Sequence, residues 1–150
     1  MKRVHLLTIG KLKDKDLLNF EQQYLKRIKS FKLNITELKA LAEDKDKEAE
    51  LVISKIKNIS SSAYSILLTE HTDTKTSPNF SKWFYGRLEK NSDLFLILAG
   101  AAGPGDELIN FCQEKMSLSK LTLPHQLARI TLIEQLYRAE TIFTNHPYHK

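Results

Sequence analysis

Short apolar runs alternate with longer helical patterns from one end of the chain to the other. Each run is the length of a buried strand, and the stretch after it repeats apolar residues at the three- and four-residue spacing of an amphipathic helix. The predicted strands are residues 4–9, 31–38, 63–68, 93–98 and 118–123, and the predicted helices are residues 14–28, 43–59, one beginning at 77–78, 106–116 and 126–144. This regular alternation predicts an α/β fold with a mainly parallel sheet and helices on both faces.

The chain reads as one domain without a linker. Its 150 residues are near the usual size of a single domain and can bury a core without a disulfide or metal staple. Cys112 is the only cysteine, which excludes an intrachain disulfide and fits a reducing, cytoplasmic location. The longest apolar runs fall well short of a membrane span and of a signal-peptide core, so we expect neither membrane insertion nor secretion.

Positive charge is concentrated near the N-terminus. Residues 1–39 hold 10 basic and 4 acidic side chains, whereas the other 111 residues hold 13 basic and 14 acidic ones. Such a region attracts phosphate groups, because binding releases counterions, but a solvated helix face has the same composition. The side chains available for a phosphate-binding surface are Lys11, Lys13, Lys15, Lys26, Arg27, Lys29 and Lys32.

A glycine-rich turn follows the most apolar predicted strand. It reads Ala-Gly-Ala-Ala-Gly-Pro-Gly over residues 99–105. In open α/β sheets, ligands bind outside the carboxyl ends of the strands, where loops without side chains let backbone amides approach. The turn lacks the Gly-Lys-Ser/Thr ending of a P-loop, and its spacing reverses the dinucleotide fingerprint. A turn that needs positive φ explains its glycines equally well.

The C-terminal tail, residues 145–150, is the second candidate region. It reads Asn-His-Pro-Tyr-His-Lys, which is more aromatic and more rigid than a frayed end, so we expect it to dock into a site. Metal binding is not expected, because His146 and His149 have no neighbouring carboxylate or thiolate to complete a coordination shell. The serine-hydrolase elbow and the zinc-protease motif are both absent.

Three motifs in the final third of the chain resemble the RlmH family, SPOUT-class methyltransferases that modify a pseudouridine of bacterial large-subunit ribosomal RNA. They are Leu-Ser-Lys-Leu-Thr-Leu-Pro-His at 118–125, Ile-Glu-Gln-Leu-Tyr-Arg-Ala at 133–139 and the tail at 145–150. The size of the chain and its order of strands and helices agree with the family over the full length. Weaker matches are the strand and turn at 4–10 and Leu68 before Ser77–Pro78.

The resemblance implies a C-terminal trefoil knot, a homodimer, and S-adenosylmethionine bound by the loops of the knot. Carried over position by position, the cofactor would be held by Leu68, Gly100, Leu118, Ser119, Lys120, Leu121, Thr122 and Leu123. Backbone groups would dominate this pocket. A glycine at position 100 would then let the ligand approach where a side chain would block it.

The implied reaction is methylation of N3 of the pseudouridine, within large-subunit rRNA in an assembled ribosome. The residues implied around the target base are His125, Arg138, Tyr148 and His149. Arg138 would steer phosphate or the developing anion, and His149 would remove the proton, although water or His125 could equally do so. Glu134, one turn before Arg138, could orient the arginine. The tail would reach the pocket of the partner subunit, so activity would require the dimer.

The chain departs from the family pattern at two places. After the third predicted strand it reads Leu-Thr-Glu-His-Thr-Asp at 68–73, without the glycine that relatives carry, and the Gly-rich turn lacks the usual Gly-Gly-Pro. An alternative function is therefore a non-catalytic ribosome- or RNA-binding protein with a degenerate cofactor loop. A third reading, an α/β domain with an unrelated small ligand, would make the three C-terminal matches coincidental. Binding of the cofactor distinguishes the alternatives.

Overall fold

Five parallel strands form one central sheet in the computed structural model, which describes all 150 residues. The strand order is β2-β1-β4-β3-β5, and every neighbouring pair is parallel. The strands are β1 (Arg3–Ile9), β2 (Lys32–Leu38), β3 (Tyr64–Leu68), β4 (Asp93–Leu98) and β5 (Glu114–Met116), and the helices are α1 (Lys15–Arg27), α2 (Lys45–Ile59), α3 (Ser77–Lys90), α4 (Asp106–Phe111) and α5 (His125–Phe143). The predicted α/β class and parallel sheet are confirmed.

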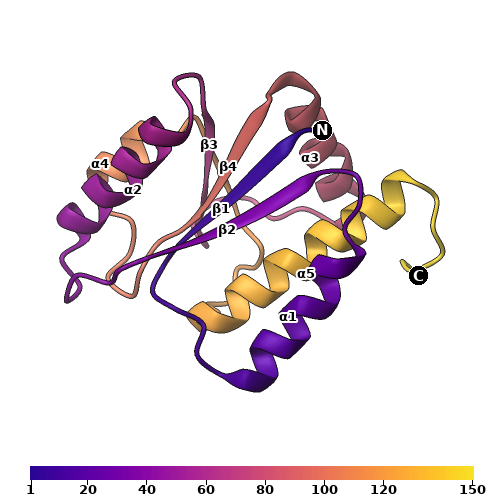
Figure 1. Cartoon of the computed structure of the whole chain (residues 1–150), viewed down its shortest axis with the longest axis horizontal. Coiled ribbons are helices and arrows are strands. Elements are labelled where there is room, and N and C mark those ends of the chain that lie inside the picture. The colour runs from indigo at the N-terminus through magenta and orange to yellow at the C-terminus, as the bar shows by residue number, and fades with distance from the viewer.

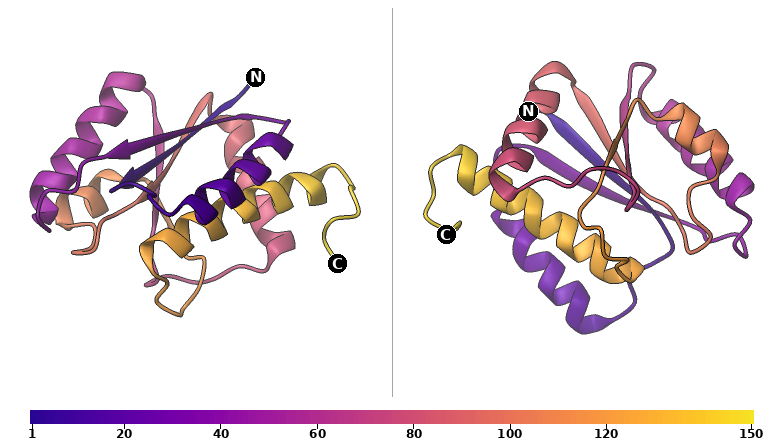
Figure 2. Two further views of the ribbon diagram at one scale, coloured as in Figure 1. Left: turned by 60° about the horizontal axis from the view of Figure 1, so that its bottom comes forward. Right: turned by 180° about the vertical axis from the view of Figure 1, so that it is seen from behind.

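Helices cover both faces of the sheet. Figures 1 and 2 show α1, α3 and α5 on one side and α2 with α4 on the other. Side chains of the central strand β4 alternate between the two cores: Leu94, Leu96 and Leu98 pack with the first group of helices, and Phe95 and Ile97 with the second. A strand buried on both faces is mostly apolar, which explains the uninterrupted run from Leu94 to Leu98; the buried Asp93 at its start pairs with Arg3 and His5.

The predicted helix over residues 106–116 is wrong in its second half. Helix α4 ends at Phe111, and Glu114–Met116 form the edge strand β5 beside β3. Gln113, between the helix and the strand, is bonded to β3. Its backbone N–H donates to the Ser65 carbonyl at 3.0 Å, and its side-chain oxygen accepts from the Ser65 N–H at 2.7 Å. A strand of three residues carries too little pattern to be separated from a helix end by periodicity.

The predicted strand at residues 118–123 is also wrong, because this segment is a loop. Serine side chains form hydrogen bonds with backbone groups of this loop. The Ser117 hydroxyl donates to the Ser119 carbonyl at 3.0 Å, and the Ser119 hydroxyl accepts from the Leu121 N–H at 2.9 Å. Such local hydrogen bonds compete with a sheet ladder. Helix α3 begins at Ser77, within the predicted range, and Thr76 is its N-cap.

No helix is long and apolar enough to span a membrane. The trefoil knot implied by the resemblance stays a prediction.

Candidate functional site

A cavity of about 370 Å³ opens beyond the carboxyl ends of β3 and β4. Three segments far apart in the sequence line it: the end of β3 with residues 69–71, the end of β4 with the Gly-rich turn, and the loop that leads into α5. This volume lies within the range of small-molecule sites, and the place is where ligands bind in open parallel sheets. The walls combine leucine side chains with exposed backbone, contributed by Leu68, Leu98, Leu118, Leu121 and Leu123 and by Ala99, Gly100, Ala101, Gly103 and Pro104.

Seven of the eight residues assigned to the cofactor by the resemblance line this one cavity. Lys120 is the exception: it is exposed on the same loop and is not part of the wall. Sequence reasoning missed Thr69, Glu70 and His71, which line the cavity beside Leu68. Their position directly after a buried strand could have predicted them, because the carboxyl ends of parallel strands lie at the same edge of the sheet, where ligands bind.

The structure gives a different reason for glycine at position 100. A Cβ atom there would lie 2.8 Å from Glu48 Oε1 and 3.0 Å from Ile9 Cγ2, so the missing side chain makes room for helix α2 behind the turn. Gly105 follows the same rule, because its Cβ would meet the Lys45 carbonyl at 3.2 Å. Gly103 has open space around it but a φ of +89°, which glycine adopts at least cost. Helix packing and backbone conformation, more than ligand approach, explain these glycines.

His125 stands where the cavity meets the start of α5. Its Nε2 atom is buried and has no hydrogen-bond partner. Burial, together with the charge of Arg129 one turn later, lowers the pKa of His125, and the backbone of Ile9 and of Ala99 offsets only part of the shift. The shift favours the neutral ring, whose free Nε2 can accept or donate one hydrogen bond at the cavity wall.

This shift predicts that acid weakens the fold through His125. Because the pKa of His125 is lower in the folded protein, the unfolded chain binds a proton first as the pH falls below the ordinary histidine range. The free energy of unfolding should therefore fall more steeply in wild type than in His125→Gln between pH 7.5 and 5.5, measured by urea denaturation. Equal slopes in the two proteins would contradict the shift.

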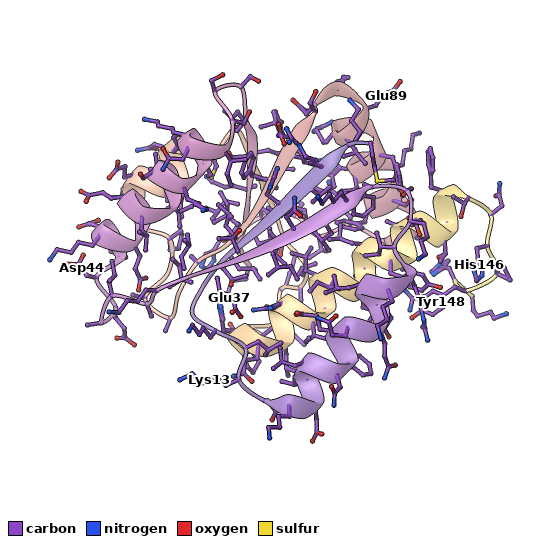
Figure 3. All side chains as sticks on the ribbon, in the orientation of Figure 1. Lys13, Glu37, Asp44, Glu89, His146 and Tyr148 are labelled. Atoms are coloured by element: carbon purple, nitrogen blue, oxygen red, sulfur yellow. The ribbon has the colours of Figure 1, made fainter.

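A second group of predicted residues gathers at the other end of α5; Glu134, Arg138, Tyr148 and His149 are called the tail cluster below. Arg138 donates to both oxygens of Glu134, at 2.9 and 3.1 Å, and its guanidinium lies over the Tyr148 ring, 4.7 Å from the centroid. Its Nη1 is 3.1 Å from His149 Nδ1. Tyr148 also packs edge-on against Tyr137, with ring centroids 4.8 Å apart. The tail thus docks on the helix of its own chain, as Figure 3 shows for Tyr148.

The tail cluster has a defined protonation pattern. The hydrogen bond and charge of Glu134 raise the pKa of Arg138, while burial, with Tyr24 and Glu134, raises the pKa of Tyr148 to about 12. Tyr148 therefore keeps its proton at neutral pH. Since an arginine can only donate, His149 Nδ1 must accept from Arg138, which places the proton of the neutral ring on Nε2. In this arrangement the other ring nitrogen of His149, Nε2, can only donate. His149 can therefore take a proton from a substrate only after Arg138 releases Nδ1.

Within one chain, the four residues predicted around the target base fall into two places. His125 and Arg138 are 13 positions apart on α5, which corresponds to about 20 Å along the helix. His125 belongs to the cavity, whereas Arg138, Tyr148 and His149 belong to the tail cluster. One chain does not bring these two groups of residues together.

Sequence reasoning also missed a buried ion pair network next to the cavity. Arg129, on α5 one turn after His125, donates to both oxygens of Glu21 at 2.7 and 2.9 Å and to Glu37 at 2.6 Å. Its side chain is 6% exposed. The network fastens α1 and β2 to the N-terminal part of α5, the part that carries His125 and Ala128 into the cavity wall. No local pattern marks these partners, since Glu21 and Arg129 are 108 positions apart.

Comparisons with known proteins show which family the chain resembles over its whole length. Residues 1–149 match a family model described as "Predicted SPOUT methyltransferase". A protein of Clostridium perfringens named Ribosomal RNA large subunit methyltransferase H 1 is 35% identical, with 98% of this chain and 99% of the relative covered. Proteins named Ribosomal RNA large subunit methyltransferase H are 35% identical in Bacillus pumilus, over 98% of this chain and 99% of the relative, and 33% identical in Phocaeicola vulgatus, over 96% of each.

Proposed function

The chain belongs to the SPOUT methyltransferase family, and from this premise we propose that it uses S-adenosylmethionine to methylate N3 of a pseudouridine in large-subunit ribosomal RNA. The observation that carries the proposal is the cavity beyond β3 and β4. Seven residues assigned to the cofactor from sequence motifs alone converge on it from three separate segments. The names of the relatives supply the class of substrate.

The walls of the cavity suit S-adenosylmethionine. Leucine side chains offer an apolar surface to an adenine ring and to the methylene groups of the methionine chain, and the backbone of residues 99–104 and 118–123 offers polar groups without bulky side chains. Glu70 adds a carboxylate for a cationic group of the ligand, and the unpartnered Nε2 of His125 adds one free hydrogen-bonding position. When bound, the cofactor supplies a methyl group on a positively charged sulfur.

The tail cluster is proposed to handle the target base. The base must lose the proton on N3 before that nitrogen accepts the methyl group, and the negative charge that develops needs a fixed cation nearby. Arg138 offers this charge, held in place by Glu134, and Tyr148 offers a phenol that stays protonated. Because Arg138 donates to His149 Nδ1, we propose that water accepts the proton from N3 of the base. His149 could accept it only when Arg138 has moved to the substrate. Positioning and electrostatics are the contribution of the protein.

A homodimer is part of this proposal. The cavity and the tail cluster lie at opposite ends of α5, so one chain cannot place both around a single base. A second copy that brings its tail cluster to the cavity of the first would complete the site. The basic region of residues 1–39 would then contact phosphates, and the shape of the ribosome would supply specificity, which this small domain cannot supply by itself. The site of action would be the cytoplasm.

The experiment that tests the proposal is calorimetric titration with S-adenosylmethionine. Wild type should bind with a measurable heat, and Thr122→Trp should abolish or strongly weaken binding, because Thr122 is an exposed residue of the cavity wall and the indole would fill the cavity. Lys120→Trp is the matched control, since Lys120 is exposed on the same loop but outside the wall. No heat and no thermal stabilisation of wild type at saturating cofactor would instead favour a non-catalytic RNA-binding protein.

A further inference from the structure

Glu48 is a buried carboxylate directly behind the Gly-rich turn. It lies on the first turns of α2 and is 4% exposed. Its Oε2 accepts a hydrogen bond from the Leu41 N–H at 2.9 Å, whereas its Oε1 is buried without any partner. Oε1 points at Gly100, where a Cβ would lie only 2.8 Å away. No cation pairs with this carboxylate, and a buried acceptor without a donor is rare and costly.

The position of Glu48 connects two loops at the carboxyl edge of the sheet. One is the Gly-rich turn, whose far side is the wall of the cavity. The other is the loop between β2 and α2, in which Ala42 and Glu43 both have positive φ, at 52° and 63°. Residues other than glycine seldom adopt positive φ, and this conformation persists only where surrounding contacts stabilise it. The Leu41 N–H bond to Glu48 is such a contact.

We propose that Glu48 is a positioning residue for the cofactor, whose free Oε1 accepts a backbone N–H of the Gly-rich turn when the cavity is filled. This rests on the proposed function, because it assumes that the ligand is S-adenosylmethionine. A ligand bound in the cavity would displace the turn toward α2, where Glu48 Oε1 is an unpaired acceptor. The hydrogen bond to Oε1 then forms only when the cavity is filled, whereas in the free protein this buried acceptor is unpaired. The bond therefore stabilises the bound state relative to the free protein and favours binding.

The test compares Glu48→Gln with wild type by calorimetric titration and thermal unfolding. The amide keeps the size of the side chain, and its oxygen keeps the Leu41 N–H bond. Its NH2 group then faces Gly100, where it cannot accept an N–H. We expect the Kd for S-adenosylmethionine to rise about tenfold, while the Tm of the free protein stays within about 2 °C of wild type.

Asp44→Ala is the matched control, because Asp44 caps the same helix but faces solvent. Its Oδ1 accepts from the Lys47 N–H at 3.1 Å. This variant should lower the Tm by a few degrees and leave the Kd within about twofold, since it loosens the helix end without touching Gly100. Hydrogen exchange adds an independent signal: the cofactor should slow exchange of the amides of residues 101 and 102 more strongly in wild type than in Glu48→Gln, because the Gly103 N–H already donates to the Gly100 carbonyl.

Each outcome is decisive. A Kd for Glu48→Gln within about twofold of wild type, or an equal loss of binding in Asp44→Ala, would overturn the positioning role, because the carboxylate would then act only on the stability of α2. If wild type itself does not bind S-adenosylmethionine, the proposed function fails first and the role of Glu48 fails with it.

Discussion

Replacing Arg138 with alanine should lower the rate of methyl transfer to ribosomes about a hundredfold or more, the usual cost of losing one fixed charge at a developing anion. Arg138 holds the tail cluster together: it donates to Glu134, lies over Tyr148 and contacts His149. The measurement is single-turnover transfer of labelled methyl to purified ribosomes at saturating cofactor. Arg138→Lys should recover only part of the rate, because an ammonium keeps the charge but cannot hold both oxygens of Glu134.

Two controls accompany this measurement. The Kd of Arg138→Ala for S-adenosylmethionine should stay close to that of wild type, because no residue of the tail cluster lines the cavity and the proposed contact of Arg138 is with the base. His149→Ala should lose less activity than Arg138→Ala, since in the present arrangement His149 is a neighbour of the charge and not its source. Near-normal rates in both alanine variants would remove the tail cluster from the active site.

Mixing two inactive variants tests the composite site. Arg138→Ala has an intact cavity, and Thr122→Trp has an intact tail cluster. If the tail cluster of one subunit completes the cavity of the other, heterodimers formed by refolding the two together should regain part of the activity. If native mass spectrometry shows that heterodimers form and the mixture is still as inactive as its components, the composite site is contradicted.

Replacing Arg129 with leucine should destabilise the protein by about 3–5 kcal/mol, a large share of the stability of a domain of this size. The substitution leaves Glu21, 2% exposed, as a buried carboxylate without its two hydrogen bonds. Glu37 is less affected because it is partly exposed and also accepts from the Leu12 N–H. Urea denaturation of the purified variant measures the change in the free energy of unfolding.

The double variant Glu21→Leu with Arg129→Leu separates the two causes of this loss. An apolar pair of similar volume removes the unpaired charge and should recover most of the stability. Lys26→Leu, an exposed basic-to-leucine change on α1, should stay within about 0.5 kcal/mol of wild type. If Arg129→Leu were as mild as this surface change, the network would not hold α1 and β2 to α5.

The alternation of short apolar runs with helical patterns determined the class of the fold, because strands buried on both faces are mostly apolar. The strongest run was predicted at residues 93–98 and is β4 (Asp93–Leu98). The motif at residues 118–125 likewise determined one of the three segments of the cavity wall, six of its 17 residues, since a short loop keeps the residues of one motif close together. Where the pattern was short, at residues 112–116 and 118–123, hydrogen bonds of Gln113 and Ser119 decided the outcome instead.

Only the tertiary structure decided which distant groups meet. Glu21 and Glu37 pair with Arg129, and Glu48 lies behind Gly100, although nothing in the local sequence marks these partners. The packing of α2 against the Gly-rich turn also replaced ligand approach as the main reason for glycine at position 100. The length of α5 then separated His125 from the tail cluster. Periodicity reports which face of an element is buried, whereas contacts between elements depend on how the whole chain packs, and that information is not local.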